Sequence, residues 1–322
     1  MVWYVVAIIA IAFIFDFSNG FHDSANSIAT IVGTRVLNPL AAVFWAATFN
    51  FAALFTGNVA VAKAVGGGMI EQSIVDPHVI LGGLLGAICW NVITWIYGIP
   101  SSSSHALIGG YAGAAMAKAG THGITWGSKW VQTLSFIVIS PFVGFLAGFG
   151  LMVACYWTFR RLNAARIDHV FRPAQLLSSA MLSYSHGGND AQKTMGIILG
   201  LLVASKSYFA GQTGWLHYLY VADFKTIPRW VEVGAYSMIS LGTLFGGWRI
   251  VHTMGSRITK LRPMGALRRR RGARSRSSLR PTGESRSAPR TRSPARSSAL
   301  ARPTGSRRSA GGWRGGSCGP GS

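Results

Sequence analysis

Two long stretches without a charged residue constrain the fold of this 322-residue chain more than any other feature. Residues 77–117 and residues 130–159 contain no Asp, Glu, Lys or Arg. A helix needs about 20 mostly apolar residues to cross the hydrocarbon core of a bilayer, so each stretch is long enough for at least one span. We therefore predict an all-α polytopic membrane protein rather than two soluble domains.

Changes in composition along the chain predict four regions. Residues 1–159 form a first transmembrane repeat, residues 160–173 a basic loop, residues 174–262 a partial second repeat, and residues 263–322 a disordered tail. Arginines gather in the loop 160–173 and again after residue 248. The positive-inside rule places the loop 160–173 and the segment 249–322 in the cytoplasm.

Two similar polar motifs interrupt the apolar runs. The first, GFHDSANSIAT, begins at Gly20, and the second, SYSHGGNDAQKTMG, contains Gly187. Aligning these two glycines places Asp23 opposite Asp190, which predicts two copies of one motif, each in a glycine-broken helix. Ionisable groups in hydrocarbon cost about 2.5–3.5 kcal/mol on insertion scales, so they mark a functional site. Matching breaks in two halves are typical of the central binding site of a transporter.

Carboxylate and amide oxygens in these motifs are the predicted ligands of a coupling cation. They belong to Asp23, Asn26, Asp190 and Gln192. Transporters coordinate Na⁺ or exchange a proton through such groups beside a helix break, and a Na⁺ ion would sit at Asp23 and Asp190. The alternative is that these side chains only bond neighbouring helices together. Two aspartates in a repeated pattern favour the ion site.

A serine-rich segment, GIPSSSSHALIGG from Gly98, is the third feature. Its four consecutive serines are Ser101, Ser102, Ser103 and Ser104. They precede a helix, whose N-terminus offers unpaired N–H groups and a positive dipole end to an anion. Simple helix capping is the plainer interpretation. Four serines exceed what one cap needs, so we favour an anion site.

Three histidines and a lysine near the motifs have no decisive pattern. His22 and His105 are candidate proton carriers, although local hydrogen bonding accounts for them, and for His186, equally well. Lys193 either balances the charge of an anion or pairs with Asp190. The sequence contains no GxxxxGK[ST] loop and no nucleophile–base or metal-ligand constellation. We therefore expect neither an enzyme nor a cofactor.

Together the three motifs resemble those of the inorganic phosphate transporter (PiT) family, and the likeness runs from about Phe15 to Gly265. The resemblance implies a carrier of two inverted repeats that moves orthophosphate by symport with H⁺ or Na⁺. His22 stands where many members have Asn, which is similar to the bacterial, proton-coupled branch and implies a location in a bacterial inner membrane. The residues implied for phosphate are Ser101, Ser102, Ser103, Ser104 and Asn189, and those for the cation are Asp23, Asn26 and Asp190. The expected partners are phosphate, H⁺ or Na⁺, the lipid bilayer and a second copy in a homodimer. A sulfate permease is the rival within the transport class.

The segment after Pro263 departs from the pattern of the family. It holds 15 Arg, no Lys and one acid, Glu284, among Ser, Gly, Pro and Ala. Such a composition buries too little apolar area to fold. We expect a frameshift product in which the second serine-rich hairpin is missing, so that this chain transports phosphate poorly. The alternative is a native tail of a membrane-anchored protein that binds RNA or anionic lipid; without it we expect no nucleic-acid partner.

Overall fold

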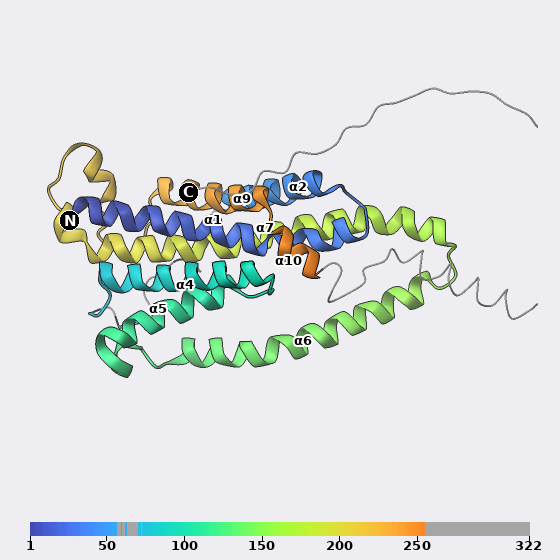
Figure 1. The fold of residues 1–322 in the computed structure, drawn as a ribbon, viewed down its shortest axis with the longest axis horizontal. Helices are drawn as coiled ribbons and strands as arrows, with labels where there is room; N and C mark the ends of the chain where they lie inside the picture. Colours follow the sequence, from blue (N-terminus) through green and yellow to red (C-terminus); the bar gives the residue numbers. More distant parts are fainter. Residues whose placement is uncertain (57–58, 60–61, 63–69, 72, 255–322) are drawn as a thin grey trace, which may run out of the picture. The chain divides into compact units, whose positions relative to one another are not determined.

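The computed structural model describes residues 1–56, 59, 62, 70, 71 and 73–254. These residues form helices and their connections, which confirms the all-α prediction (Figure 1). The predicted tail at residues 263–322 lies outside the described residues, as does most of the loop before Ile70. The α-helices are α1 (Val2–Gly33), α2 (Pro39–Ala52), α4 (Pro77–Tyr97), α5 (Ser103–Ala119), α6 (Ser128–Phe159), α7 (Ala164–Ala204), α8 (Lys206–Phe209), α9 (Arg229–Phe245) and α10 (Trp248–His252). Three 3₁₀ turns join them, η1 (Ala53–Thr56), η2 (Gly120–Gly123) and η3 (Gly214–Leu219).

Four helical segments of the described residues are long and apolar enough to cross a membrane. They are Val2–Gly33, Pro39–Thr56, Pro77–Tyr97 and Trp130–Phe159. The last of these, most of α6, has no buried residue in its most apolar window. An apolar helix exposed along its length is suited to a bilayer rather than to water, so the chain is a membrane protein.

The two helices that carry the polar motifs are continuous, and the predicted glycine breaks are wrong. α1 and α7 run through Gly20 and Gly187 without interruption. A Cβ atom on Gly20 would lie 2.0 Å from the carbonyl oxygen of Ile239 in α9, and one on Gly187 would lie 2.4 Å from that of Asn50 in α2. Both glycines therefore serve close contact between helix backbones, as small residues do in membrane helix pairs.

Helix α7 also begins earlier than the sequence indicated. Asn163 caps its first turn by accepting a hydrogen bond from the backbone N–H of Arg166, and the helix continues through Pro173. Half of the arginines of the predicted basic loop consequently lie in α7, and the turn between α6 and α7 is short. The cytoplasmic location of this turn stays a prediction.

Helices α1 and α7 pack side by side in opposite directions (Figure 1). Residues that come later in α1 contact residues that come earlier in α7. The contacting pairs are Asp16 with Thr194, Asn19 with Asp190, Asp23 with His186, Ser27 with Ser179, and Thr34 with Gln175. α1 also packs against α9, and α7 against α2. Each motif helix thus packs against a helix that follows the other motif helix in the chain.

The α4–α5 hairpin brings the serine-rich segment to this helix pair. Gly83 and Gly110 let the two helices approach, because a Cβ atom on Gly110 would lie 2.5 Å from the carbonyl oxygen of Gly83. Asp76 caps α4 and forms a 2.7 Å ion pair with Lys118 near the end of α5. Partial burial by itself raises the pKa of Asp76, but hydrogen bonds from Lys118 and the Val79 N–H outweigh it and lower the pKa below its ordinary value.

We expect Gly20→Ala to destabilise the protein and Gly113→Ala to stabilise it slightly. The methyl group at residue 20 overlaps the backbone of α9, and overpacking of this kind costs about 1–3 kcal/mol. The position of Gly113 in α5 is open, and alanine is favoured over glycine in a helix by about 1 kcal/mol. Thermal unfolding of the two variants in detergent tests this. Equal melting temperatures for both variants would contradict the assigned role of Gly20.

We expect Asp76→Asn to lower stability at neutral pH by less than about 1 kcal/mol, because the asparagine keeps the cap and removes only a partly exposed ion pair. A carboxyl group with a lowered pKa stabilises the folded state above its ordinary pKa, and this contribution disappears as the pH falls through the lowered value. The difference in melting temperature between wild type and variant should therefore shrink on acidification. A difference that grows in acid would show that Lys118 does not act on the Asp76 carboxylate.

Candidate functional site

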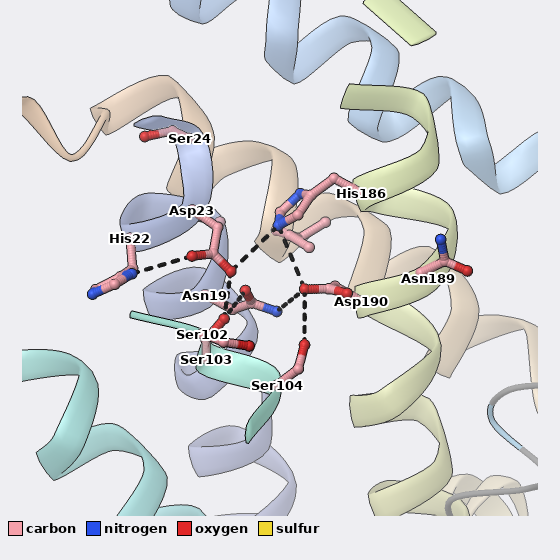
Figure 2. A network of polar contacts seen from close by, with 12 residues as sticks. Asn19, His22, Asp23, Ser24, Ser102, Ser103, Ser104, His186, Asn189 and Asp190 are labelled. Carbon is pink, nitrogen blue, oxygen red and sulfur yellow. Dashed lines mark hydrogen bonds and ion pairs between the residues drawn. The ribbon is translucent and has the colours of Figure 1, made fainter. Parts of the chain in front are cut away.

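The centre of the site is a histidine between two carboxylates. His186 on α7 places its Nε2 atom 3.7 Å from Asp23 Oδ2 on α1 and 3.5 Å from Asp190 Oδ2, one turn along α7 (Figure 2). All three side chains are largely buried, with 13% or less of their surface exposed. His186 Nε2 has no hydrogen-bond partner among the described residues. A proton on this nitrogen would form ion pairs with both carboxylates.

The N-terminus of α5 supplies hydroxyl groups to both carboxylates. Ser103 Oγ lies 2.5 Å from Asp23 Oδ2 and 2.6 Å from Asn19 Oδ1, and Ser104 Oγ lies 3.3 Å from Asp190 Oδ2 (Figure 2). Asn19 in turn donates from Nδ2 to Asp190 Oδ2 at 3.4 Å. A hydroxyl has one proton to donate, so Ser103 satisfies only one of its two acceptors at a time.

Two basic side chains complete the network. Lys193 donates from Nζ to Asp190 Oδ1 at 2.5 Å and to Ser104 Oγ. Of the two alternatives that the sequence left open for Lys193, the structure contains the pairing with Asp190. His22 lies behind Asp23, with Nδ1 3.2 Å from Asp23 Oδ1 and Nε2 2.9 Å from the hydroxyl of Thr94 in α4. His22 is buried, so its ring is held inside the helix bundle.

A small hollow between α5, α6 and α7 reaches Lys193. It is lined mainly by apolar side chains, including Leu107, Tyr111, Trp130 and Ile197. Lys193 therefore lies between the polar network and these apolar side chains.

The structure brings some of the predicted residues together and separates others. Asp23, Asp190, Ser103, Ser104 and His22 belong to one network (Figure 2). Asn26, His105 and Asn189 are exposed. Figure 2 shows Asn189 on the side of α7 away from the network, and its amide donates to Ser185 of its own helix.

The remaining predicted residues have structural contacts of their own. Ser102 caps α5 by accepting from the His105 N–H at 3.3 Å, as the plainer interpretation of the serines proposed. Ser101 accepts from the Trp90 indole at 2.9 Å. Gln192 is buried, donates to the Gly188 carbonyl and accepts from the Ala62 N–H.

Asn19 was missed by the sequence analysis, and His186 was given no role. Both precede a motif aspartate by four residues, which is one helical turn, so they share a helix face with Asp23 and Asp190 respectively. The alignment of Gly20 with Gly187 also sets Asn19 opposite His186. The contact of Asn19 with Asp190 and that of His186 with Asp23 are therefore the same contact in the two repeats.

The chemistry of the network suits both a cation and an anion. One ligand atom from each of Asp23, His186 and Asp190 lies within 4.8 Å of the others, close enough to share a cation or a proton. Ser104 and Lys193 are donors beside them, at the positive end of the α5 helix dipole. An anion in a membrane interior requires hydrogen-bond donors and a nearby positive charge, and here that charge would be the cation or proton shared by Asp23, His186 and Asp190.

We expect His186→Ala to lower the stability of the protein by about 3 kcal/mol, because Asp23 and Asp190 then face each other without the basic side chain between them. Asn189→Ala is the matched control on the same helix, and should change stability by less than about 0.5 kcal/mol. Thermal unfolding in detergent at neutral pH measures both. A larger loss for the Asn189 variant would show that the network is not formed as described.

Comparisons with known proteins agree with this arrangement of motifs. A model of the phosphate transporter family matches residues 19–272 of the chain. The chain is 51% identical over 259 residues to a probable low-affinity inorganic phosphate transporter of Rhizobium meliloti (strain 1021), covering 80% of this chain and 73% of the relative. It is 42% identical over 268 residues to the protein of the same description from Bacillus subtilis (strain 168), covering 80% and 74%.

The fold is also similar to a solved structure, that of a protein described as the sodium-dependent phosphate transporter. The TM-score is 0.68, and the match covers 80% of this chain and 78% of the other. The two sequences are 23% identical, so this comparison supports the fold.

Proposed function

This chain belongs to the phosphate transporter family, and we propose that it moves inorganic phosphate across a membrane together with protons. Membership of a transporter family confirms the expectation that the chain is not an enzyme. The observation that carries the proposal is the network in which Asp23 and Asp190, one from each motif helix, share His186 and the hydroxyls at the start of α5.

Phosphate would be held by donors that carry little fixed charge. Ser103 and Ser104 offer hydroxyls at the start of α5, and Lys193 is the permanent cation within reach of Ser104. Backbone N–H groups at a helix N-terminus add to this set. Hydroxyl and N–H donors bind an oxyanion without holding it so tightly that it cannot leave.

A proton fits this site better than Na⁺ does. Na⁺ is a hard cation and prefers a shell of oxygen ligands, whereas the atom between the two carboxylates is a histidine nitrogen. Histidine gains and loses a proton near neutral pH, and His22 contacts the far side of Asp23. His186 and His22 thus give Asp23 a titratable partner on each side.

The orientation in the membrane follows from the basic residues. Arg160 and Arg161 lie in the turn between α6 and α7, and we infer that this turn faces the cytoplasm of a bacterial cell. On that basis α1 runs inward from Val2 to Gly33, and α7 runs outward.

The proposal is tested by uptake of labelled phosphate into proteoliposomes containing the 322-residue chain, with an imposed pH gradient or Na⁺ gradient. We expect slow but saturable uptake that is driven by the pH gradient and is outcompeted by phosphate better than by sulfate. Asp190→Asn and Ser103→Ala should each reduce it by about tenfold or more, since each removes a buried charged or hydrogen-bonded contact. Ser101→Ala, outside the network, should leave it within about twofold.

Binding of labelled phosphate to the purified protein gives a second measurement that does not depend on a complete transport cycle. Absence of saturable binding, or equal effects of the Ser101 and Ser103 substitutions, would overturn the proposal. Na⁺-driven uptake at constant pH would show that the coupling ion is Na⁺.

A further inference from the structure

Asp16 is a fully buried carboxylate that the network described above does not use. It lies on α1 at the N-terminal side of Asn19 and Asp23, and the three recur at the spacing of one helix face. Its neighbour in sequence, Phe15, is a fully buried member of the main apolar cluster, as is Met195 on the facing part of α7. The side chain is therefore surrounded by core rather than by water.

One oxygen of Asp16 has a hydrogen bond and the other does not. Thr194 donates from Oγ1 to Asp16 Oδ1 at 2.6 Å. Oδ2 is buried and has no hydrogen-bond partner among the described residues. A bare anionic oxygen in such surroundings is strongly disfavoured, whereas a neutral carboxyl group carries its proton on that same oxygen. A metal cation would need several further oxygen ligands, and Thr194 is the polar contact recorded for this carboxylate.

The charged and titratable groups that act on Asp16 come from two other helices. Asp190 and Lys193 on α7 are its electrostatic neighbours, and Tyr236 on α9 is within electrostatic range. Lys193 and Asp190 pair with each other, so their effects on Asp16 largely cancel. Within the described part of the chain, no unpaired cation therefore lies at this end of the network to stabilise the anionic form of Asp16.

We propose that Asp16 is an additional proton-binding site of this carrier, separate from His186. The inference rests on the proposed function. On protonation an O–H bond forms at Oδ2 and the carboxylate becomes a neutral acid, and on release the proton returns to water on the other side of the membrane. The step involves no oxidation or reduction and no other group.

The position of Asp16 couples its proton to phosphate. An anion that engages Lys193 draws the ammonium away from Asp190 and makes the local potential more negative. A more negative potential favours the protonated form of Asp16. By linkage, protonation of Asp16 favours phosphate binding to the same extent, which is the requirement for symport. Thr194 directly follows Lys193 in α7, so any shift of this part of the helix would move both side chains together.

The substitution Asp16→Asn tests this, because asparagine has nearly the shape of the protonated acid but cannot release a proton. In proteoliposomes we expect exchange of internal for external labelled phosphate to stay within about twofold of wild type, while accumulation driven by a pH gradient falls by about tenfold or more. Exchange does not require the proton to leave, and accumulation does. Asp223→Asn, at an exposed loop aspartate, is the control and should leave both rates unchanged.

Infrared spectroscopy of the purified protein tests the protonation itself. The carbonyl stretching band of a protonated carboxyl group should be present in wild type at neutral pH, absent in Asp16→Asn, and retained in Asp223→Asn. Identical spectra for wild type and Asp16→Asn, or equal losses of exchange and accumulation, would overturn the assignment of Asp16. Failure of the wild-type chain to bind phosphate would overturn the proposed function instead, and the infrared band would still decide the state of Asp16.

Discussion

An ionisable side chain in the middle of a bilayer needs a partner, because hydrocarbon offers it neither water nor counter-ions. The pairing of α1 with α7 gives partners to most of the polar side chains in the middle of these two helices. Each step along α1 brings a polar side chain to one from α7, and the serines of α5 reach the same place from the side. The network is therefore what allows these helices to be buried together, and under the proposed function it is also where the permeating ions would bind.

Close contact between helices is the second condition for forming this polar network. Short side chains such as Asn19 and Asp190 can form a hydrogen bond only if the backbones of their helices lie close together. Helices α9 and α2 pack against α1 and α7 and hold them in place. Gly20 and Gly187 make those contacts backbone to backbone. The two motif helices are thus interlocked with their neighbours, since α1 lies against α9 and α7 lies against α2. A change in either repeat is expected to be felt in both halves of the site.

The sequence identified the fold class, the two aspartates and the serine segment for physical reasons that are visible in one dimension. Charge-free stretches indicate membrane helices, and repeated ionisable residues within them predict a site, whose binding role stays a prediction. The sequence did not indicate which side of a helix a residue occupies, or which distant residues a helix contacts. Asn189 directly precedes Asp190 and Asn26 follows Asp23 by three residues, but both side chains are exposed, and Asn189 lies on the side of α7 away from the network. Glycine lowers helix propensity, so Gly20 and Gly187 suggested breaks, but the contacts with α9 and α2 that require glycine come from residues far along the chain.

The balance of charge in the site connects these features to transport. Asp23 and Asp190 carry two negative charges, and Lys193 supplies one permanent positive charge. A single proton on His186 makes this set neutral, and a neutral set costs least to bury. An arriving phosphate anion disturbs the balance, and a further proton restores it. Under the proposal, Asp16, buried one contact further along the same helix pair, already carries that proton when phosphate arrives, so phosphate and proton would enter the hydrocarbon region as a compensated pair.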